Sequence, residues 1–185
     1  MNSAGVAVIK RKSRTNPEPL ARIGVISDTH GLYDDAVTEH FAGVDHILHA
    51  GDIGGAAVID RLKVIAPVTA VSGNVDGFEA SGFPREEVVT IGRRRIALYH
   101  RLYESGAMTR DGRAFLERAG ADVCVFGHTH RPATERLGRM LLFNPGSAGP
   151  KRFTLPRGIG LLLIYSDAIA PLYISLPDRA QSSLE

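Results

Sequence analysis

The chain has 185 residues, of which 44% are hydrophobic, enough to form the core of one globular domain. Its 22 basic and 20 acidic residues leave a net charge of only +2, which does not by itself predict a nucleic-acid-binding protein. A single cysteine, Cys124, excludes an intramolecular disulfide, and no run approaches the ~20 apolar residues of a membrane span, so we expect a cytoplasmic protein with no membrane partner.

The two ends of the chain differ in pattern from its middle. Residues 1–20 contain a basic cluster and two prolines without a sustained period, and we expect a flexible extension there. Residues 178–185 are small or polar and are expected to form a frayed tail. Between them, residues 21–177 are expected to form a single domain.

Short apolar runs alternate with helical patterns in the first part of this domain, which is typical of buried strands in an α/β fold. One helix is predicted over residues 32–42, beginning at Asp34 or Asp35, and a second over residues 55–65. A third is predicted over residues 109–119, with Thr109 as its cap and Gly120 as its stop.

The remaining strands are predicted from shorter patterns. Residues 87–91 and 95–100 flank Gly92 and indicate a β-hairpin, whose arginine cluster at 93–95 we interpret as a solvated turn rather than a nucleic-acid contact. Four more strands are predicted over residues 134–136, 140–143, 158–165 and 170–176. We expect these four to form a second sheet, or a meander that completes the structure.

Five apolar runs end in a carboxylate, an amide or an imidazole. The side chains concerned are Asp28, His30, Asp52, Asn74, His100, His128 and His130. Because ligands bind outside the carboxyl ends of the strands in such sheets, we expect all seven to converge on one rim. A mixed set of oxygen and nitrogen donors without a thiolate suits Mn, Fe, Zn or Ni better than Ca. If Asp52 bridges, the set provides four bonds to each of two divalent ions.

Two such ions would suit the hydrolysis of a phosphate ester. A pair of ions about 3.5–4 Å apart can activate a water as a metal-bound hydroxide and clamp the phosphoryl oxygens during in-line attack on phosphorus. With two carboxylates and a bridging hydroxide the centre remains positive and attracts phosphate. The glycines before Asp52, Asn74 and His128 allow tight turns, so that backbone and substrate approach closely.

The motif order D-x-H, G-D, G-N-x-D, H and G-H-x-H resembles that of the calcineurin-like metallophosphoesterases over about residues 22–176. The Asn-Pro-Gly-Ser segment at 144–147 is similar to the small bacterial and archaeal phosphodiesterase branch, which is itself similar to the sorting scaffold subunit of retromer. The resemblance implies a four-layer α/β/β/α sandwich with two mixed sheets. It places Asp28, His30, Asp52 and His130 around one ion and Asp52, Asn74, His100 and His128 around the other. Asp52, Asn74 and His100 are the expected catalytic residues, and Mn²⁺ is the expected metal.

Two residues depart from the family pattern. Val75 stands where the wider superfamily has a histidine that is the usual candidate for protonating the leaving group. Arg101 follows His100 where the small branch tends to have glycine, and it either narrows the pocket or contacts a substrate phosphate.

Three further features keep a structural interpretation beside a functional one. His40 lies on a predicted helix and is expected to be structural. His49 either orients a ligand or is a plain buried histidine. The segment at 144–147 is either a plain turn or a contact with substrate.

The sequence therefore predicts a metal-dependent phosphodiesterase that acts on a small phosphodiester. One alternative is a nuclease or cyclic-nucleotide hydrolase, against which the lack of a basic stripe argues. The other is a non-catalytic protein-interaction scaffold of the same fold, and the presence of every ligand histidine favours the enzyme over it. A homo-oligomer stays open.

Overall fold

The computed structural model describes residues 18–76 and 82–178, and two five-stranded sheets dominate them. The first sheet has the order β12-β11-β1-β2-β3 and the second β4-β5-β8-β10-β9. The first contains β1 (Ala21–Ile26), β2 (His46–His49), β3 (Val68–Ala70), β11 (Gly158–Ile164) and β12 (Ile169–Ser175). The second contains β4 (Glu86–Ile91), β5 (Arg94–Tyr99), β8 (Val123–Val125), β9 (Ala133–Leu137) and β10 (Met140–Asn144).

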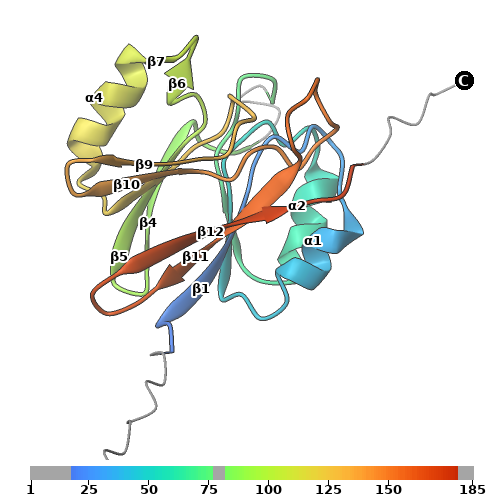
Figure 1. The fold of residues 1–185 in the computed structure, drawn as a ribbon, viewed down its shortest axis with the longest axis horizontal. Helices are drawn as coiled ribbons and strands as arrows, with labels where there is room; N and C mark the ends of the chain where they lie inside the picture. Colours follow the sequence, from blue (N-terminus) through green and yellow to red (C-terminus); the bar gives the residue numbers. More distant parts are fainter. Residues whose placement is uncertain (1–17, 77–81, 179–185) are drawn as a thin grey trace, which may run out of the picture.

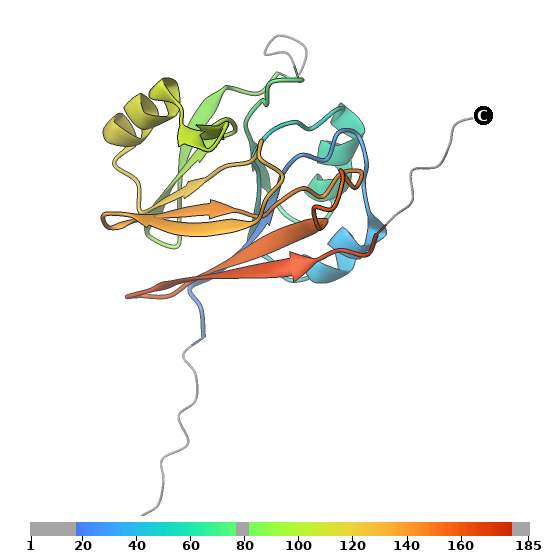
Figure 2. The same cartoon turned by 45° about the horizontal axis from the view of Figure 1, so that its top comes forward.

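Helices cover the outer face of each sheet, as Figures 1 and 2 show from two directions. The helices α1 (Asp35–His40) and α2 (Ala56–Lys63) pack on the first sheet, and α4 (Arg110–Ala119) packs on the second. The predicted four-layer α/β/β/α sandwich with two mixed sheets is therefore confirmed.

Alternating side chains along the strands build the layers. In β1, Ile23 and Val25 pack between the two sheets, while Ile26 faces the helices of the first sheet. In β8, Val123 and Val125 pack between the sheets, while Cys124 faces α4. Burial on both faces explains why these strands appear in the sequence as unbroken apolar runs.

The helix ends follow from local chemistry. Asp34 caps α1 by accepting a hydrogen bond from the backbone N–H of Ala36, so the helix begins at Asp35 and is shorter than the predicted span of 32–42. Thr109 caps α4 as predicted, and Gly120 ends it in the left-handed region at φ 55°.

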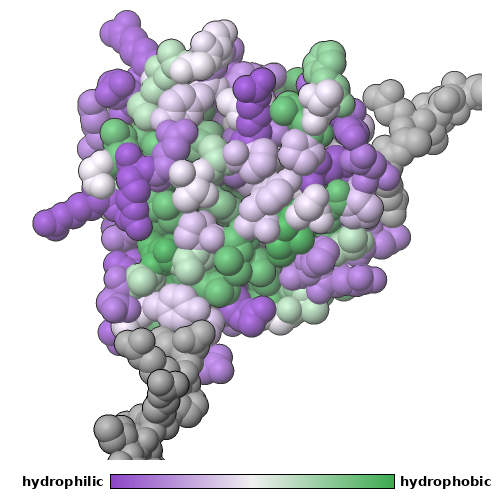
Figure 3. Space-filling view, in the orientation of Figure 1, coloured by the Kyte–Doolittle hydropathy of each residue, from purple (hydrophilic) through white to green (hydrophobic). Residues whose placement is uncertain are grey.

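The prediction that the last four strands form a sheet or meander of their own is wrong. β9 and β10 join the second sheet, whereas β11 and β12 join the first, with β11 antiparallel to β1. Figure 3 shows apolar residues over the face on which β11 and β12 lie in Figure 1. On the edge strand β12, Leu172 is 45% exposed and Tyr173 is 41% exposed.

A short hairpin of β6 (Tyr103–Glu104) and β7 (Ala107–Met108) has no counterpart in the prediction. Its two-residue strands are too short to give an alternating pattern. The hairpin follows β5 directly, and its residue Glu104 lies 3.8 Å from His128.

The strands that precede the predicted ligands run parallel within each sheet. β1, β2 and β3 are parallel in the first sheet, and β5, β8 and β10 are parallel in the second. Their carboxyl ends therefore meet at one edge of the sandwich. None of the described helices is long and apolar enough to cross a membrane.

The predicted terminal segments fall mostly outside the described residues. Of the extension at 1–20 only 18–20 are described, and the backbone N–H of Leu20 already donates to the carbonyl oxygen of Ile164. Of the tail at 178–185 only Asp178 is described.

Candidate metal centre

All seven predicted ligands follow strands whose carboxyl ends meet at the same edge. They are Asp28 and His30 after β1, Asp52 after β2, Asn74 after β3, His100 after β5, and His128 and His130 after β8. Asp28, Asp52, His100 and His130 are buried, His30 and His128 are half-buried, and Asn74 is exposed. The two sheets thus contribute donors to a single centre.

Asp28, His30 and His130 form the first group of donors. Asp28 Oδ1 lies 3.1 Å from His130 Nε2, and His30 Nε2 lies 3.4 Å from the same nitrogen. One ligand atom from each of the three lies within 4.8 Å of the others. Asp52 Oδ2 borders this group, at 3.9 Å from His30 Nε2.

The second group surrounds His100. Its Nε2 lies 3.3 Å from Asp52 Oδ2, 3.9 Å from Asp28 Oδ1 and 3.1 Å from Asn74 Oδ1. Asn74 Oδ1 also lies 2.9 Å from His128 Nδ1. Asp28 as well as Asp52 therefore lies between the two groups, whereas only Asp52 was expected to be shared. The assignment of each side chain to an ion stays a prediction.

The surroundings of Asp28 Oδ1 support a cation in this centre. This buried carboxylate oxygen lies 3.1 Å from His130 Nε2 and 3.9 Å from His100 Nε2, and no described residue gives it a hydrogen bond of good geometry. A buried carboxylate oxygen that is not fully satisfied is costly, and a cation shared with the imidazole nitrogens would satisfy it. Carboxylate, amide and imidazole donors without a thiolate fit a divalent transition metal. Cys124 faces α4 instead, and burial raises the pKa of its thiol.

At Asp52, His30 and His128 the electrostatics favour the protonation states that bind metals. At His100 burial is outweighed by the hydrogen bond to Asp52 and by the charge of Asp28, which raise its pKa, so a metal bound there would have to displace a proton. Burial opposes the ionisation of Asp52, but contact with His100 and the N–H of Val75 outweigh it and lower the pKa to about 2. Burial lowers the pKa of His30, and the nearby Arg152 guanidinium lowers it further. Burial also lowers the pKa of His128. The carboxylate is therefore ionised and these two rings neutral at neutral pH, as ligation requires.

Five of the seven candidates have a left-handed backbone. The φ angles are 54° at Asp28, 48° at His30, 52° at Asp52, 68° at His128 and 55° at His130. Residues other than glycine adopt this region uncommonly, and such conformations cluster at functional sites. Here the loops after β1 and β2 hold each other, because the N–H of Asp28 donates to Gly51 and that of His30 donates to Asp52.

Glycines let the ligand loops approach one another. A Cβ on Gly73 would collide with the carboxylate and backbone nitrogen of Asp52, and one on Gly127 would collide with Ser27 Oγ. The close approach expected from the sequence is therefore between neighbouring loops of the chain.

His49 connects two of these loops and contacts none of the seven candidates directly. Thr29 Oγ1 donates to the carbonyl oxygen of Ile53 at 2.8 Å and therefore accepts from His49 Nε2 at 2.9 Å. His49 Nδ1 then accepts from the backbone N–H of Gly51 at 3.2 Å. His49 is thus a buried histidine that positions the loops carrying Asp28 and Asp52. His40 lies exposed near the end of α1, and its structural role stays a prediction.

The segment at 144–147 braces the centre from behind. Asn144 Nδ2 donates to the carbonyl oxygen of Gly127 at 3.0 Å and to Thr129 Oγ1 at 3.1 Å. Ser147 Oγ donates to the carbonyl oxygen of Asp28 at 3.0 Å. The segment therefore supports two ligand loops and is more than a plain turn, while a contact with substrate stays a prediction.

Two residues at the rim were not predicted from the sequence. Arg152 Nη2 lies 3.3 Å from His30 Nε2, although the residues are 122 positions apart. Glu104 Oε1 lies 3.8 Å from His128 Nε2 and 3.6 Å from Arg101 Nη1. Neither belongs to a motif or a periodic pattern, so no local signal identifies them.

Comparison with known proteins agrees with this geometry. The profile of the calcineurin-like phosphoesterase superfamily domain matches residues 21–167. A probable metallophosphoesterase of Methanothermobacter thermautotrophicus is 39% identical over 140 residues, which cover 72% of this chain and 81% of that protein.

Two solved structures share the fold. A Vps29 from Entamoeba histolytica has a TM-score of 0.66 at 23% identity, covering 84% of this chain and 99% of that one. A structure described as a novel archaeal phosphodiesterase has a TM-score of 0.65 at 24% identity, with the same coverage of 84% and 99%. Together, the profile match, the identity to the archaeal relative and the edge of converging donors show that the chain belongs to the calcineurin-like phosphoesterase superfamily.

Proposed function

We propose that this metal-dependent phosphoesterase is a phosphodiesterase whose site holds two divalent ions, with Mn²⁺ as the expected metal. Asp28, His30, Asp52 and His130 would hold one ion, and Asp52, Asn74, His100 and His128 the other. Two such ions would supply an activated water and neutralise the phosphoryl oxygens of an ester. The observation that carries the proposal is the convergence of two donor groups, Asp28 with His30 and His130, and Asp28 with Asp52 and His100, in each of which the ligand atoms lie within 4.8 Å of one another.

The side chains around the centre would orient the substrate. The Arg152 guanidinium, beside His30, offers donors to an anionic substrate at the rim. The backbone N–H of Val75 donates to Asp52 Oδ1 at 3.1 Å and helps to fix that carboxylate. Val75 is 58% exposed and its side chain has no ionisable group, so it cannot donate a proton to the leaving group.

The choice of a diester draws on the archaeal phosphodiesterase of the same fold. The likeness to Vps29 at 23% identity carries the fold alone, and the complete donor set favours the enzyme over a scaffold. A small phosphodiester is the proposed substrate.

The test combines metal analysis with hydrolysis of bis(p-nitrophenyl) phosphate in the presence of Mn²⁺. The wild type should bind two ions per chain and turn over the diester faster than the matching monoester. His130→Asn should bind less metal. Its activity should fall by more than the about 10- to 100-fold that is lost when a residue that only hydrogen-bonds a metal ligand is removed. His40→Asn, the same change at an exposed helical position, should behave as the wild type.

Three outcomes would contradict parts of the proposal. A folded wild-type protein that binds no divalent ion would refute the metal centre. Equal activity of His130→Asn and His40→Asn would remove His130 from the ligands. A protein that binds two ions but hydrolyses no phosphodiester would favour the scaffold instead.

A further inference from the structure

A cavity of about 300 Å³ lies beside the candidate metal centre. Asn74 and His100 form the wall that it shares with the centre, and Arg85, Arg101, Tyr99 and Asp111 line the rest together with Ser72 and Gly73. Its volume is at the lower end of ligand pockets, which suits one arm of a small ester.

We propose that this cavity binds a second anionic group of the substrate, so that the preferred phosphodiester carries a further phosphate or carboxylate on one ester arm. The inference rests on the proposed function, because the scissile phosphate is taken to lie against the donors that include Asn74 and His100. An arm of that ester would then extend between Arg85 and Arg101.

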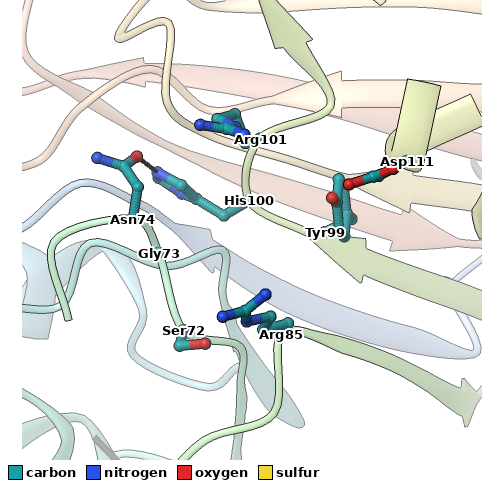
Figure 4. A pocket seen from close by; sticks show the side chains of 8 residues that line it. All are labelled: Ser72, Gly73, Asn74, Arg85, Tyr99, His100, Arg101 and Asp111. Atoms are coloured by element: carbon teal, nitrogen blue, oxygen red, sulfur yellow. Dashed lines mark hydrogen bonds between the residues drawn. The ribbon is translucent and has the colours of Figure 1, made fainter. Parts of the chain in front are cut away.

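The two arginines are placed to receive an anion. In Figure 4, Arg101 and Arg85 lie on opposite sides of His100, and both guanidinium groups are turned toward the side on which Asn74 lies. Asp111 lies beside Tyr99, on the other side of His100 from Asn74. The positive charge of the cavity is therefore concentrated next to the metal centre.

Both guanidinium groups keep donors available for a ligand. Arg85 is exposed and makes no hydrogen bond or ion pair with any described residue. Arg101 pairs with Glu104 at 3.6 Å, but the two side chains are 48% and 50% exposed. An exposed ion pair of this kind contributes at most about 1 kcal/mol, and a guanidinium has five N–H donors, so an incoming anion can displace or share the pair.

Arginine suits the proposed ligand better than other cations would. Its planar fork matches the oxygens of a phosphate or carboxylate, and two such forks across a small cavity select a group with several anionic oxygens. The resemblance to the small phosphodiesterase branch predicts glycine after the fourth-motif histidine, so Arg101 is a feature of this chain that the common chemistry does not require.

The experiment uses two substrates that differ at one end. One is a p-nitrophenyl phosphodiester whose alkyl arm ends in a phosphate, and the other is the same diester ending in a hydroxyl. With the Mn²⁺-loaded wild type, kcat/KM should be at least about tenfold higher for the phosphate-ended diester, mainly through a lower KM, as one charge-assisted contact predicts. Arg85→Gln and Arg101→Gln should each remove most of this preference.

The matched control is Arg93→Gln. It removes the same charge at the turn before β5, at the opposite end of that strand from His100, and should keep the preference. A binding measurement without turnover accompanies it. Calorimetric titration with an alkyl bisphosphate and with the corresponding alkyl monophosphate should show tighter binding of the bisphosphate in the wild type and in Arg93→Gln, but not in the other two variants.

These measurements separate the two proposals. Metal-dependent turnover without a preference for the phosphate-ended diester would refute the second-anion site and leave the phosphodiesterase standing. A bisphosphate preference that depends on Arg85 and Arg101, without turnover of either diester, would support the site and refute the phosphodiesterase. The absence of both would refute both.

Discussion

Arg157 provides the most direct test of how the fold supports the centre. Its side chain is buried at 1% exposure, and its Nη1 lies 3.0 Å from Asp34 Oδ2. It also donates to the carbonyl oxygens of Ala148 at 2.8 Å, Gly149 at 2.7 Å and Pro177. Arg157→Met would leave a buried carboxylate and three carbonyl groups without this cation.

The expected loss follows from this burial. Removal of one partner of a buried ion pair costs about 3–5 kcal/mol of unfolding free energy. For a domain of this size that loss corresponds to a fall of about 6–20 °C in Tm. The double variant Asp34→Asn/Arg157→Met should lose less than the single one, because asparagine still caps α1 and the buried negative charge is removed together with the cation.

Urea unfolding in chelator, followed by circular dichroism, measures these differences without contributions from metal. The control is Arg61→Met, which removes an exposed ion pair with Asp35 and should cost no more than about 1 kcal/mol. Equal losses for Arg157→Met and Arg61→Met, or a double variant no more stable than the single one, would show that the buried pair of Asp34 and Arg157 does not stabilise the fold in this way. The N–H groups of Ala148 and Gly149 donate to Ser27 and Asp28, so Arg157→Met should also weaken metal binding.

Three further predictions concern the centre itself. Mn²⁺ at a hundredfold excess over its dissociation constant should stabilise the fold by about 2.7 kcal/mol, seen as a higher Tm than in chelator, and the difference should shrink in His130→Asn; an identical Tm in both solutions would argue against a cation site. Because position 75 supplies no acid, a plot of log kcat/KM against leaving-group pKa should fall steeply for the wild type and less steeply for Val75→His. A flat wild-type plot, with the chemical step rate-limiting, would mean that another group protonates the leaving oxygen. Burial lowers the pKa of His49 from 6.5 to about 4, so below pH 6.5 the unfolded chain binds a proton that the folded chain does not. The contribution of His49 to the unfolding free energy is therefore full above pH 6.5 and falls by about 3 kcal/mol as the pH drops to about 4. Unfolding free energies measured in chelator should depend less on pH in His49→Gln than in the wild type, and an equal pH dependence would contradict this.

Local patterns in the sequence were enough to predict the α/β class and the candidate donors, whereas the four layers were expected from the family resemblance. Apolar runs alternating with helical patterns depend on neighbouring residues only, and so do Thr109 and Gly120 at the ends of α4. The position of a donor directly after an apolar run is likewise a local feature of the sequence. Since parallel strands of an α/β sheet present their carboxyl ends at one edge, this local feature was enough to predict that the donors meet.

The pairing of distant segments could be known only from the three-dimensional structure. An apolar strand pattern is the same for either sheet, so the sequence could not assign β11 and β12 to the first sheet and β9 and β10 to the second. The contact between Arg152 and His30 spans 122 positions, and the left-handed backbone at Asp28 and Asp52 exists only because their loops bond to each other. Such contacts depend on which strands become neighbours, and that choice is made by the packing of the whole sandwich rather than by any local pattern.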